Sequence, residues 1–502
     1  MHYQGSPDRV CLWKVNAFGI DSILSNWGAG CKIIKTACIK AACMIFTQSH
    51  GRRSVMTDLS ASLSAFMTRI ARSGELSDLQ RLSGGANMES WAFDWGEGDD
   101  RRSYVLRRAP SPDYMAGRPY GHSDEAALVM AAHDAGVKAP EVVGVLADSD
   151  GMGTGYIMRR IVGEVNPAKI LAAPPPSLLT DLGRELARIH AIPAETIPAT
   201  IPVLDIASEL AEYKSRFLEY GGDRPIIALA IKWCEEHLPD PAAPVLVHGD
   251  YRMGNIMVDE HGLAGVLDWE LSHLGDPHDD LAYGCMTVWR FGQLDRPAFG
   301  VGTLDDYFAA YRDAGGAAVD PQRFHFWLVF RTLWWALGCL QMGEAWRSGA
   351  DPTVERVVIG RRTAEQELDL LMLLETGAPE EERSRPLPPS PTTAPEPKGE
   401  PSKQEIVQAV RDWLGEKIKP DASGHAKFEV AVAMNALGIV MRDLGANVSA
   451  EDARRASDIM DGAVTLADPG VLAQLRRDAI DKCTVDSPKY AALARARSQW
   501  SA

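Results

Sequence analysis

The stretch VLVHGDYRMGNIMVDEHGLAGVLDWE, residues 245–270, places a histidine, an asparagine and several carboxylates between two short apolar runs. A buried core rarely carries so many polar groups, because each one needs a hydrogen-bond partner. The pattern predicts a strand, a loop, a second strand and a turn. The polar residues are therefore either solvated loop residues or a functional site.

The turn DEHG, residues 259–262, predicts that the two strands beside it pair in antiparallel fashion. This pairing would bring Asn255, before the first strand, next to Asp268, after the second, with Asp250 on the neighbouring loop. An amide oxygen and a carboxylate suit Mg²⁺, which takes its other ligands from water and phosphate. A further carboxylate, Asp250, is placed to accept a proton from an attacking hydroxyl. The spacing H-G-D-x-x-x-x-N therefore predicts phosphoryl transfer of the kinase class.

This passage, extended by GVLDWELSHLGDPHDDLAY, resembles the aminoglycoside phosphotransferase (choline-kinase-like) family of small-molecule kinases. The segments SGGAN, VLRRAP, HGDYRMGNIMV and DWELSHLGDP most resemble one branch, the kinase domains attached to acyl-CoA dehydrogenases. The resemblance covers about residues 75–350. It implies an α+β, two-lobed protein-kinase-like fold with a small N-lobe, made of an antiparallel sheet and a helix, and a mainly helical C-lobe. ATP and Mg²⁺ are the implied cofactors.

Three residues of the loop are assigned to the catalytic machinery: Asp250 as the base, with Arg252 and His248 beside it. His248 is expected to hold the loop by hydrogen bonds rather than to transfer protons. Arg252 is expected either to contact the transferring phosphate or to pair with a carboxylate. Asn255 and Asp268 are the expected metal ligands.

Four residues of the turn LSGGANMESWAF are candidate phosphate-binding residues, because backbone N–H groups in a tight turn can meet an anion: Ser83, Gly84, Gly85 and Asn87. A plain hairpin is the alternative interpretation of this turn. Met158 lies in GYIMRRIVGE, residues 155–164, at the position of the interlobe hinge whose backbone would bind adenine.

Arg107 of YVLRR takes the position at which most kinases carry a phosphate-binding lysine, and Arg108 would point to the opposite face of that strand. Glu125, on the next predicted helix, is the expected ion-pair partner of Arg107. A solvated glutamate favoured by the helix dipole is the alternative for Glu125.

The periodicity divides the chain into four regions. Residues 1–55 show no clear period and are interpreted as an extension outside the fold, with Met56 as the natural start. The kinase-like domain follows over 56–375, with its N-lobe at about 75–165 and its C-lobe at about 166–375. A proline-rich linker, 376–402, then leads to a separate all-helical domain, 403–502.

Composition narrows the function further. A net charge of -16 argues against a general affinity for nucleic acid or anionic membrane. The apolar segment 324–343 contains Arg331 and is predicted to be a buried core helix rather than a membrane span. The eight cysteines form no C-x-x-C pair, so a reducing cytoplasm is the expected compartment.

No nucleophile elbow or P-loop is present, and the cluster from His273 to Asp280 matches no zinc motif.

The sequence therefore predicts an ATP- and Mg²⁺-dependent kinase that phosphorylates a hydroxyl group of a small metabolite. Tryptophan and arginine are frequent over 285–347, which favours an apolar or anionic acceptor over a polycation, and a hydroxyacyl-CoA is the leading candidate. An aminoglycoside or other antibiotic is a weaker alternative. A second alternative is a non-catalytic nucleotide-binding module whose C-terminal helical domain binds a protein partner or forms an oligomer.

Overall fold

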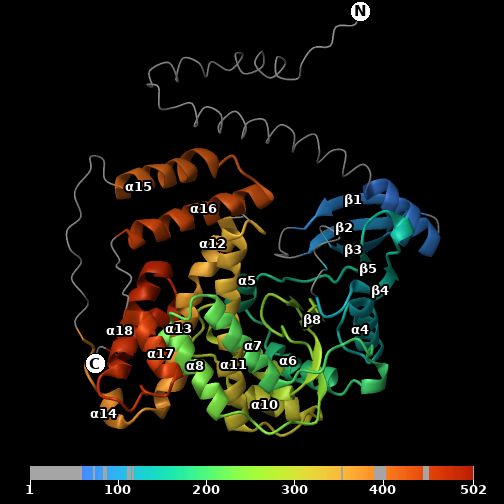
Figure 1. The fold of residues 1–502 in the computed structure, drawn as a ribbon. Helices are drawn as coiled ribbons and strands as arrows, with labels where there is room; N and C mark the ends of the chain where they lie inside the picture. Colours follow the sequence, from blue (N-terminus) through green and yellow to red (C-terminus); the bar gives the residue numbers. More distant parts are fainter. Residues whose placement is uncertain are drawn as a thin grey trace, which may run out of the picture.

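The computed structural model describes residues 59–71, 74–82, 88–109, 115, 118–351, 354–388, 403–444 and 451–500. The predicted extension over 1–55 and the second half of the predicted linker lie outside the described residues. Figure 1 shows a small lobe that contains the main sheet and a larger, mostly helical body beside and below it.

The small lobe is built on a five-stranded antiparallel sheet of order β1-β2-β3-β5-β4. Its strands are β1 (Glu75–Arg81), β2 (Glu89–Gly96), β3 (Arg102–Arg108), β4 (Val142–Val145) and β5 (Gly155–Arg159). Helix α4 (His122–Asp134) is inserted between β3 and β4 and packs on β4 and β5. The strands and the inserted helix agree with the pattern predicted from the sequence.

One face of this sheet is covered by the helix over residues 59–70. On β2, Trp91, Phe93 and Trp95 alternate along the strand and share a buried cluster with Phe66 of the helix. Alternate residues of a strand point to the same face, so these three aromatic rings form one apolar surface. Burying that surface against the helix stabilises the small lobe.

The large body contains most of the helices and two short antiparallel strand pairs. Its helices up to residue 374 are α5 (Pro167–Ala172), α6 (Leu178–His190), α7 (Ile206–Glu219), α8 (Pro225–Glu236), α9 (Pro277–Tyr283), η7 (Thr287–Arg290), α10 (Leu304–Asp313), α11 (Pro321–Arg347), α12 (Val354–Arg361) and α13 (Thr363–Leu374). The strand pairs are β6 (Val245–Val247) with β9 (His273–Gly275), and β7 (Ile256–Asp259) with β8 (Gly262–Val266). The β7–β8 pair is the antiparallel hairpin expected around the DEHG turn.

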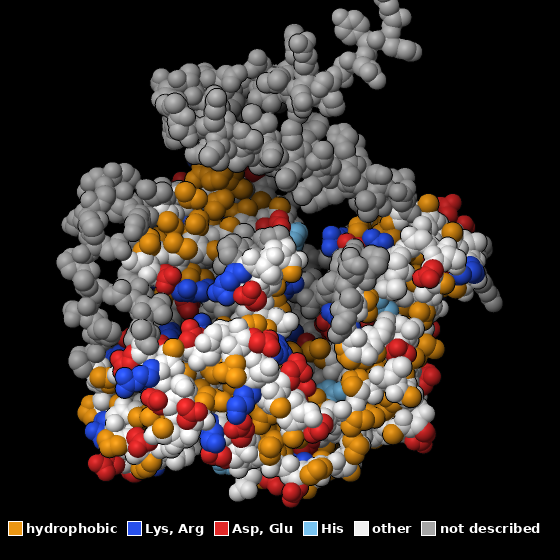
Figure 2. All heavy atoms as spheres, in the orientation of Figure 1, with side chains coloured by type: hydrophobic (Ala, Val, Ile, Leu, Met, Phe, Trp, Pro, Cys, Tyr) orange, Lys and Arg blue, Asp and Glu red, His pale blue; other side chains and the backbone are white. Residues whose placement is uncertain are grey.

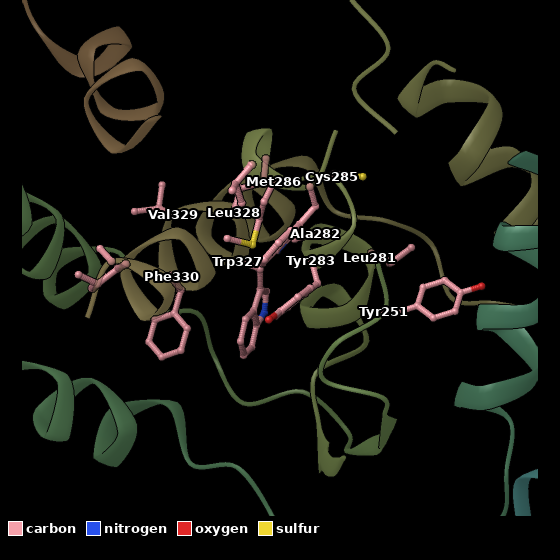
Figure 3. Packing of buried hydrophobic residues seen from close by; sticks show 14 of the residues in the cluster. Tyr251, Leu281, Ala282, Tyr283, Cys285, Met286, Trp327, Leu328, Val329 and Phe330 are labelled. Carbon is pink, nitrogen blue, oxygen red and sulfur yellow. The ribbon is translucent and has the colours of Figure 1, made fainter. Parts of the chain in front are cut away.

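Helix α11 runs through the middle of the large body and is the buried core helix that the sequence predicted. Trp327 and Phe330 are fully buried, and Figure 3 shows them near Tyr283 in the same apolar cluster. Arg331 of this helix forms a bidentate ion pair with Asp279. A buried cation is tolerated only when it is paired, and this pair explains an arginine in so apolar a helix. Among the helices that the structure describes, none is long and apolar enough to cross a membrane.

The C-terminal region is helical, as predicted. It contains α14 (Glu380–Arg383), α15 (Lys403–Trp413), α16 (Gly424–Asp443), α17 (Glu451–Met460), α18 (Val471–Asp486) and α19 (Ala491–Trp500). Helix α17 packs on α8, and α18 and α19 pack on α13. Figure 1 shows α17 and α18 against the large body and α15 beside α16 at its upper edge.

The sequence does not reveal how extensively these helices pack on the kinase-like part. Their buried residues, among them Leu475 and Trp500, belong to the same apolar cluster as the core of the large body. Buried Arg476 and the Trp500 indole both bond to Glu375, at 2.8–2.9 Å. The contact surface is therefore continuous, while independent folding of residues 403–502 stays a prediction.

Candidate active site

The motif H-G-D-x-x-x-x-N lies on the loop between β6 and β7. Gly249 adopts a φ of +80°, in the left-handed region. A Cβ atom at this position would lie 2.3 Å from the carbonyl oxygen of Leu271. Both the backbone conformation and the available space therefore require glycine, which turns the chain immediately before Asp250.

Asp250 is the expected base. Its Oδ1 accepts a hydrogen bond from Nε of Arg252 at 2.7 Å, its Oδ2 accepts one from Nη2 at 3.1 Å, and the Asn255 amide also donates to Oδ2. Burial raises the pKa of Asp250 above its ordinary value, and the charge of Arg252 opposes that rise. The carboxylate is thus more basic than a solvated one, while the positive charge of Arg252 favours its ionised form. The sequence left two partners possible for Arg252, the transferring phosphate or a carboxylate. The structure shows that Arg252 pairs with the carboxylate of Asp250.

His248 is fully buried, and both of its ring nitrogens are hydrogen bonded within the loop. Nδ1 accepts the backbone N–H of Asp250 at 3.2 Å, so Nε2 carries the proton and donates to the carbonyl of Leu267 at 3.1 Å. Burial lowers the pKa of His248, which keeps the ring neutral. This geometry supports the scaffold role expected for His248 and leaves neither nitrogen for proton transfer.

Asn255 and Asp268 flank the β7–β8 hairpin on the same side. The backbone N–H of Leu267 donates to the carbonyl of Asn255 at 2.7 Å, so the two predicted ligands are neighbours across the hairpin. Asp268 has a φ of +66°, in a region that residues other than glycine rarely adopt. The sequence gives no sign of this conformation, which is typical of a functional site.

The donor atoms of this pair fit Mg²⁺. The Asn255 amide nitrogen donates to the Asp250 carbonyl at 3.0 Å, and its Oδ1 accepts no hydrogen bond from the described residues. Oδ2 of Asp268 likewise accepts none from the described part of the chain, and this side chain is 32% exposed. An amide oxygen and a carboxylate oxygen are hard ligands that leave positions for water and phosphate. Over the described ranges, no cluster of three or more His, Cys, Asp or Glu offers another metal site.

Arg107 links the small lobe to this hairpin. Its Nη2 bonds Oδ1 of Asp268 at 2.6 Å and Oε2 of Glu270 at 2.7 Å, and its Nε lies 3.2 Å from Glu125. Partial burial works against ionisation of Asp268, but the charges of Arg107 and Arg252 outweigh it and lower the pKa of Asp268. Glu125 is buried against Arg107, so the solvated alternative for this residue is wrong.

Arg108, the neighbour of Arg107, lies on the opposite face of β3. Its guanidinium pairs with Glu89 at 2.8 Å, on the strand beside it. The alternation of side chains along β3 thus separates the two arginines as the sequence indicated.

The remaining candidate nucleotide-binding residues lie at the small-lobe turn and at the hinge. Ser83, Gly84, Gly85 and Asn87 lie outside the described residues. Met158 lies inside β5, where its main chain is paired with Val105 and Val142. Adenine binding by the main chain of Met158 itself is therefore wrong, because that backbone belongs to the sheet. The chain leaves the sheet only after Arg160, whose N–H donates to Ser103.

Three buried aspartates after the hairpin support the loop. Asp280 accepts the backbone N–H groups of His248, at 2.7 Å, and Gly249, at 2.9 Å. The oxygens of Asp276 and Asp279 are bonded to the nearby side chains of His273, His278, Arg323, Trp327 and Arg331. These contacts explain the polar cluster without a transition metal.

Sequence reasoning missed several contributors to the site. Glu270 accepts from Arg107 and pairs with Arg118 at 3.1 Å, and its only cue was an acidic residue two positions after Asp268. The Trp289 ring lies 4.2 Å from the guanidinium carbon of Arg252, beside the expected base. Because Trp289 lies in a tryptophan-rich segment, the sequence suggested that it is an ordinary core residue.

Comparison with known proteins agrees with this geometry. Residues 78–321 match the profile of the phosphotransferase enzyme family, APH. These residues form a phosphotransferase-family domain. The match includes every predicted site residue, so the phosphotransferase domain carries the whole loop and hairpin. The match agrees with the phosphoryl transfer predicted from the sequence.

Two curated relatives indicate which branch of the family this chain resembles. Acyl-CoA dehydrogenase family member 10 of Mus musculus is 29% identical over 278 residues, which cover 48% of this chain and 25% of that protein. Acyl-CoA dehydrogenase family member 11 of Gallus gallus is 28% identical over 252 residues, which cover 47% of this chain and 30% of that protein. The predicted resemblance to this branch is confirmed, and the matched segment spans only a quarter to a third of these relatives.

A solved structure confirms the fold. The crystal structure of a proposed aminoglycoside phosphotransferase from Ralstonia eutropha superposes with a TM-score of 0.50 at 22% identity, covering 63% of this chain and 98% of that one. The two-lobed kinase-like architecture of the phosphotransferase domain is therefore established. The C-terminal helices follow the residues matched by the family profile.

Proposed function

We propose that the protein is an ATP- and Mg²⁺-dependent kinase that transfers the γ-phosphate to a hydroxyl group of a small anionic metabolite. The observation that carries this proposal is the arrangement of Asp250, Asn255 and Asp268 around one hairpin. One carboxylate has a raised pKa, while the other two side chains keep oxygen atoms without hydrogen bonds from the described residues.

In the proposed reaction, Asp250 orients the acceptor hydroxyl and takes its proton. The acceptor oxygen forms a bond to the γ-phosphorus as the bond from that phosphorus to the β,γ-bridging oxygen breaks, and the nucleoside diphosphate leaves. Asn255 and Asp268 would hold Mg²⁺, which neutralises charge on the phosphate oxygens when bound. Arg107 holds Asp268 in place and would act as a cation for the phosphates.

The surroundings of the base support an anionic or apolar acceptor. Arg252 and the ring of Trp289 lie beside Asp250, which gives this side of the cleft a cation and an aromatic surface. A polycationic aminoglycoside would require acidic walls instead. Because the curated relatives are named acyl-CoA dehydrogenases, a hydroxyacyl-CoA is the first acceptor to test.

The test is phosphorylation of a panel of hydroxylated acids and hydroxyacyl-CoA thioesters with Mg²⁺ and ATP, followed by mass spectrometry. The full-length protein is compared with Asp250→Asn and with the control Asp259→Asn, an exposed residue at the end of β7 in the same hairpin. Turnover that Asp250→Asn abolishes and Asp259→Asn retains supports the proposal. ATP binding without turnover of any acceptor would instead support a non-catalytic nucleotide-binding module.

A further inference from the structure

A cavity of about 820 Å³ lies between the large body and the C-terminal helices. Its walls come from α5, η7 and the residues after it, α12, α13, α15, α16, and the connection between α18 and α19. The volume is in the range of sites that bind small metabolites. Much of the wall therefore comes from helices that follow the family match at 78–321.

One wall of the cavity adjoins the proposed active site. Trp289 lines the cavity, and its ring lies 4.2 Å from the guanidinium carbon of Arg252. Arg252 is in turn paired with Asp250. The cavity and the expected base are thus separated by one aromatic ring and one side chain.

The cavity wall carries an excess of positive charge. Arg411 of α15, Arg442 of α16 and Lys489 before α19 all line it. The two acidic residues in the wall are already neutralised: Glu365 pairs with Arg362 at 2.9 Å, and Asp486 pairs with Arg361. Figure 2 shows Lys and Arg side chains on the surface just below the α15–α16 pair.

Two of these wall cations, Arg411 and Arg442, are close enough to affect one another. Burial lowers the pKa of Arg442, Asp486 opposes this, and the charges of Arg411 and Arg361 lower it further. None of the ion pairs shown among the described residues involves Arg411 or Lys489. Cations in a cavity wall that lack a carboxylate partner, as Arg411 and Lys489 do among the described residues, are typical of a site for an anion.

Part of the remaining wall is apolar. The side chains of Leu171, Val288, Phe291, Leu294 and Ile439 line the cavity together with Trp289. An aliphatic chain lying here would be removed from water, and each buried methylene would add to affinity.

We propose that this cavity binds the tail of the acceptor, with an aliphatic segment along the apolar wall and an anionic group at Arg411, Arg442 and Lys489. To reach Asp250, the hydroxyl end of the same molecule would pass Trp289 and Arg252, and this part of the inference rests on the proposed function. The C-terminal helices then determine acceptor specificity, because they supply the cationic wall.

The test measures binding by calorimetry to the full-length protein without nucleotide. The probes are 10-hydroxydecanoate, its CoA thioester and the uncharged 1,10-decanediol. Arg411→Glu and Lys489→Glu are compared with Lys427→Glu, an exposed residue of α16 that does not line the cavity. We expect each cavity variant to weaken binding of an anionic probe at least tenfold, while Lys427→Glu leaves it within twofold and the diol responds to none of them.

The probes also separate the source of the negative charge. Tight binding of the free acid assigns the cations to a carboxylate, and binding only of the thioester assigns them to the CoA phosphates. Unchanged binding in Arg411→Glu and Lys489→Glu, or binding of neither anionic probe, would overturn the proposal. Probe binding that depends on the cavity cations, without phosphorylation of the probe by Mg²⁺-ATP, would support the cavity proposal and contradict the kinase proposal.

Discussion

Two groups of carboxylates lie on one stretch of the chain, between Asp250 and Asp280, and differ in chemistry. Asp280 is buried, and both of its oxygens accept hydrogen bonds from protein donors. Burial opposes ionisation, but the hydrogen bond and charge of His190, with smaller contributions from His248 and its backbone N–H, outweigh it and lower the pKa of Asp280. Burial raises the pKa of Asp250, whose chief partner is the single guanidinium of Arg252. Asp268 keeps one oxygen free of hydrogen bonds from the described residues and is partly exposed.

The difference teaches that polar density in a sequence does not by itself mark a catalytic group. A carboxylate that is wholly enclosed and whose pKa the protein lowers, such as Asp280, is a structural element, because a substrate or metal cannot reach it. A carboxylate that stays accessible or has a raised pKa can do chemistry. Four predictions test this distinction, from the largest expected effect to the smallest.

Asp250→Asn removes the expected base without changing the shape of the side chain. We expect kcat to fall by roughly 10²–10⁴, the usual contribution of a general base, while the thermal unfolding temperature stays close to that of the wild type. Steady-state kinetics and calorimetry check the two parts. A variant that keeps most of its kcat would exclude Asp250 from proton transfer.

Asp279→Asn removes the charge that pairs with buried Arg331. We expect the free energy of unfolding to fall by about 3–5 kcal/mol, because an unpaired cation is left in the core. Urea unfolding measures the change, and nucleotide affinity of the remaining folded protein should be unaltered. If the variant lost activity while its free energy of unfolding stayed at the wild-type value, the distinction between structural and catalytic carboxylates would be wrong.

Asp369→Asn tests a raised pKa far from the hairpin. Burial raises the pKa of Asp369 to about 8, and its side chain accepts a hydrogen bond from Tyr490. The folded protein therefore holds a proton that the unfolded chain releases, and the wild type loses stability as the pH rises from about 4 to about 8. We expect the variant to lack this decline and to be more stable at pH 8 by roughly 2 kcal/mol or more.

Unfolding curves for Asp369→Asn and wild type at several pH values provide the measurement. An equal pH dependence in both proteins would contradict the prediction. Unchanged kcat in this variant would show that a raised pKa needs a position at the cleft before it serves the reaction.

Arg252→Gln tests how the active carboxylate is tuned. Arg252 opposes the rise that burial causes in the pKa of Asp250, so its removal should raise that pKa further. The base works only when ionised, and activity is lost as the pH falls through its pKa. The acidic limb of the kcat/KM profile should therefore move to higher pH by about one unit. If the acidic limb stays in place or moves to lower pH, Arg252 does not lower the pKa of Asp250.

The sequence determined the features that depend on neighbouring residues. The DEHG turn predicts the hairpin, and the alternation along β3 places Arg107 and Arg108 on opposite faces. Such features follow from backbone periodicity and steric limits, which act over a few residues. The phosphotransferase motif is local in the same sense, so its chemistry could be predicted before the fold.

Only the tertiary structure decided which distant groups meet. Arg107 and Asp268 are 161 positions apart, and the positive φ of Asp268 that presents its carboxylate left no trace in the sequence. The C-terminal helices read as a separate unit because amphipathic periodicity shows that a face is buried without showing against what. Their packing on α8 and α13, and the cationic cavity wall near Trp289, depend on shape and charge complementarity between segments that periodicity cannot bring together.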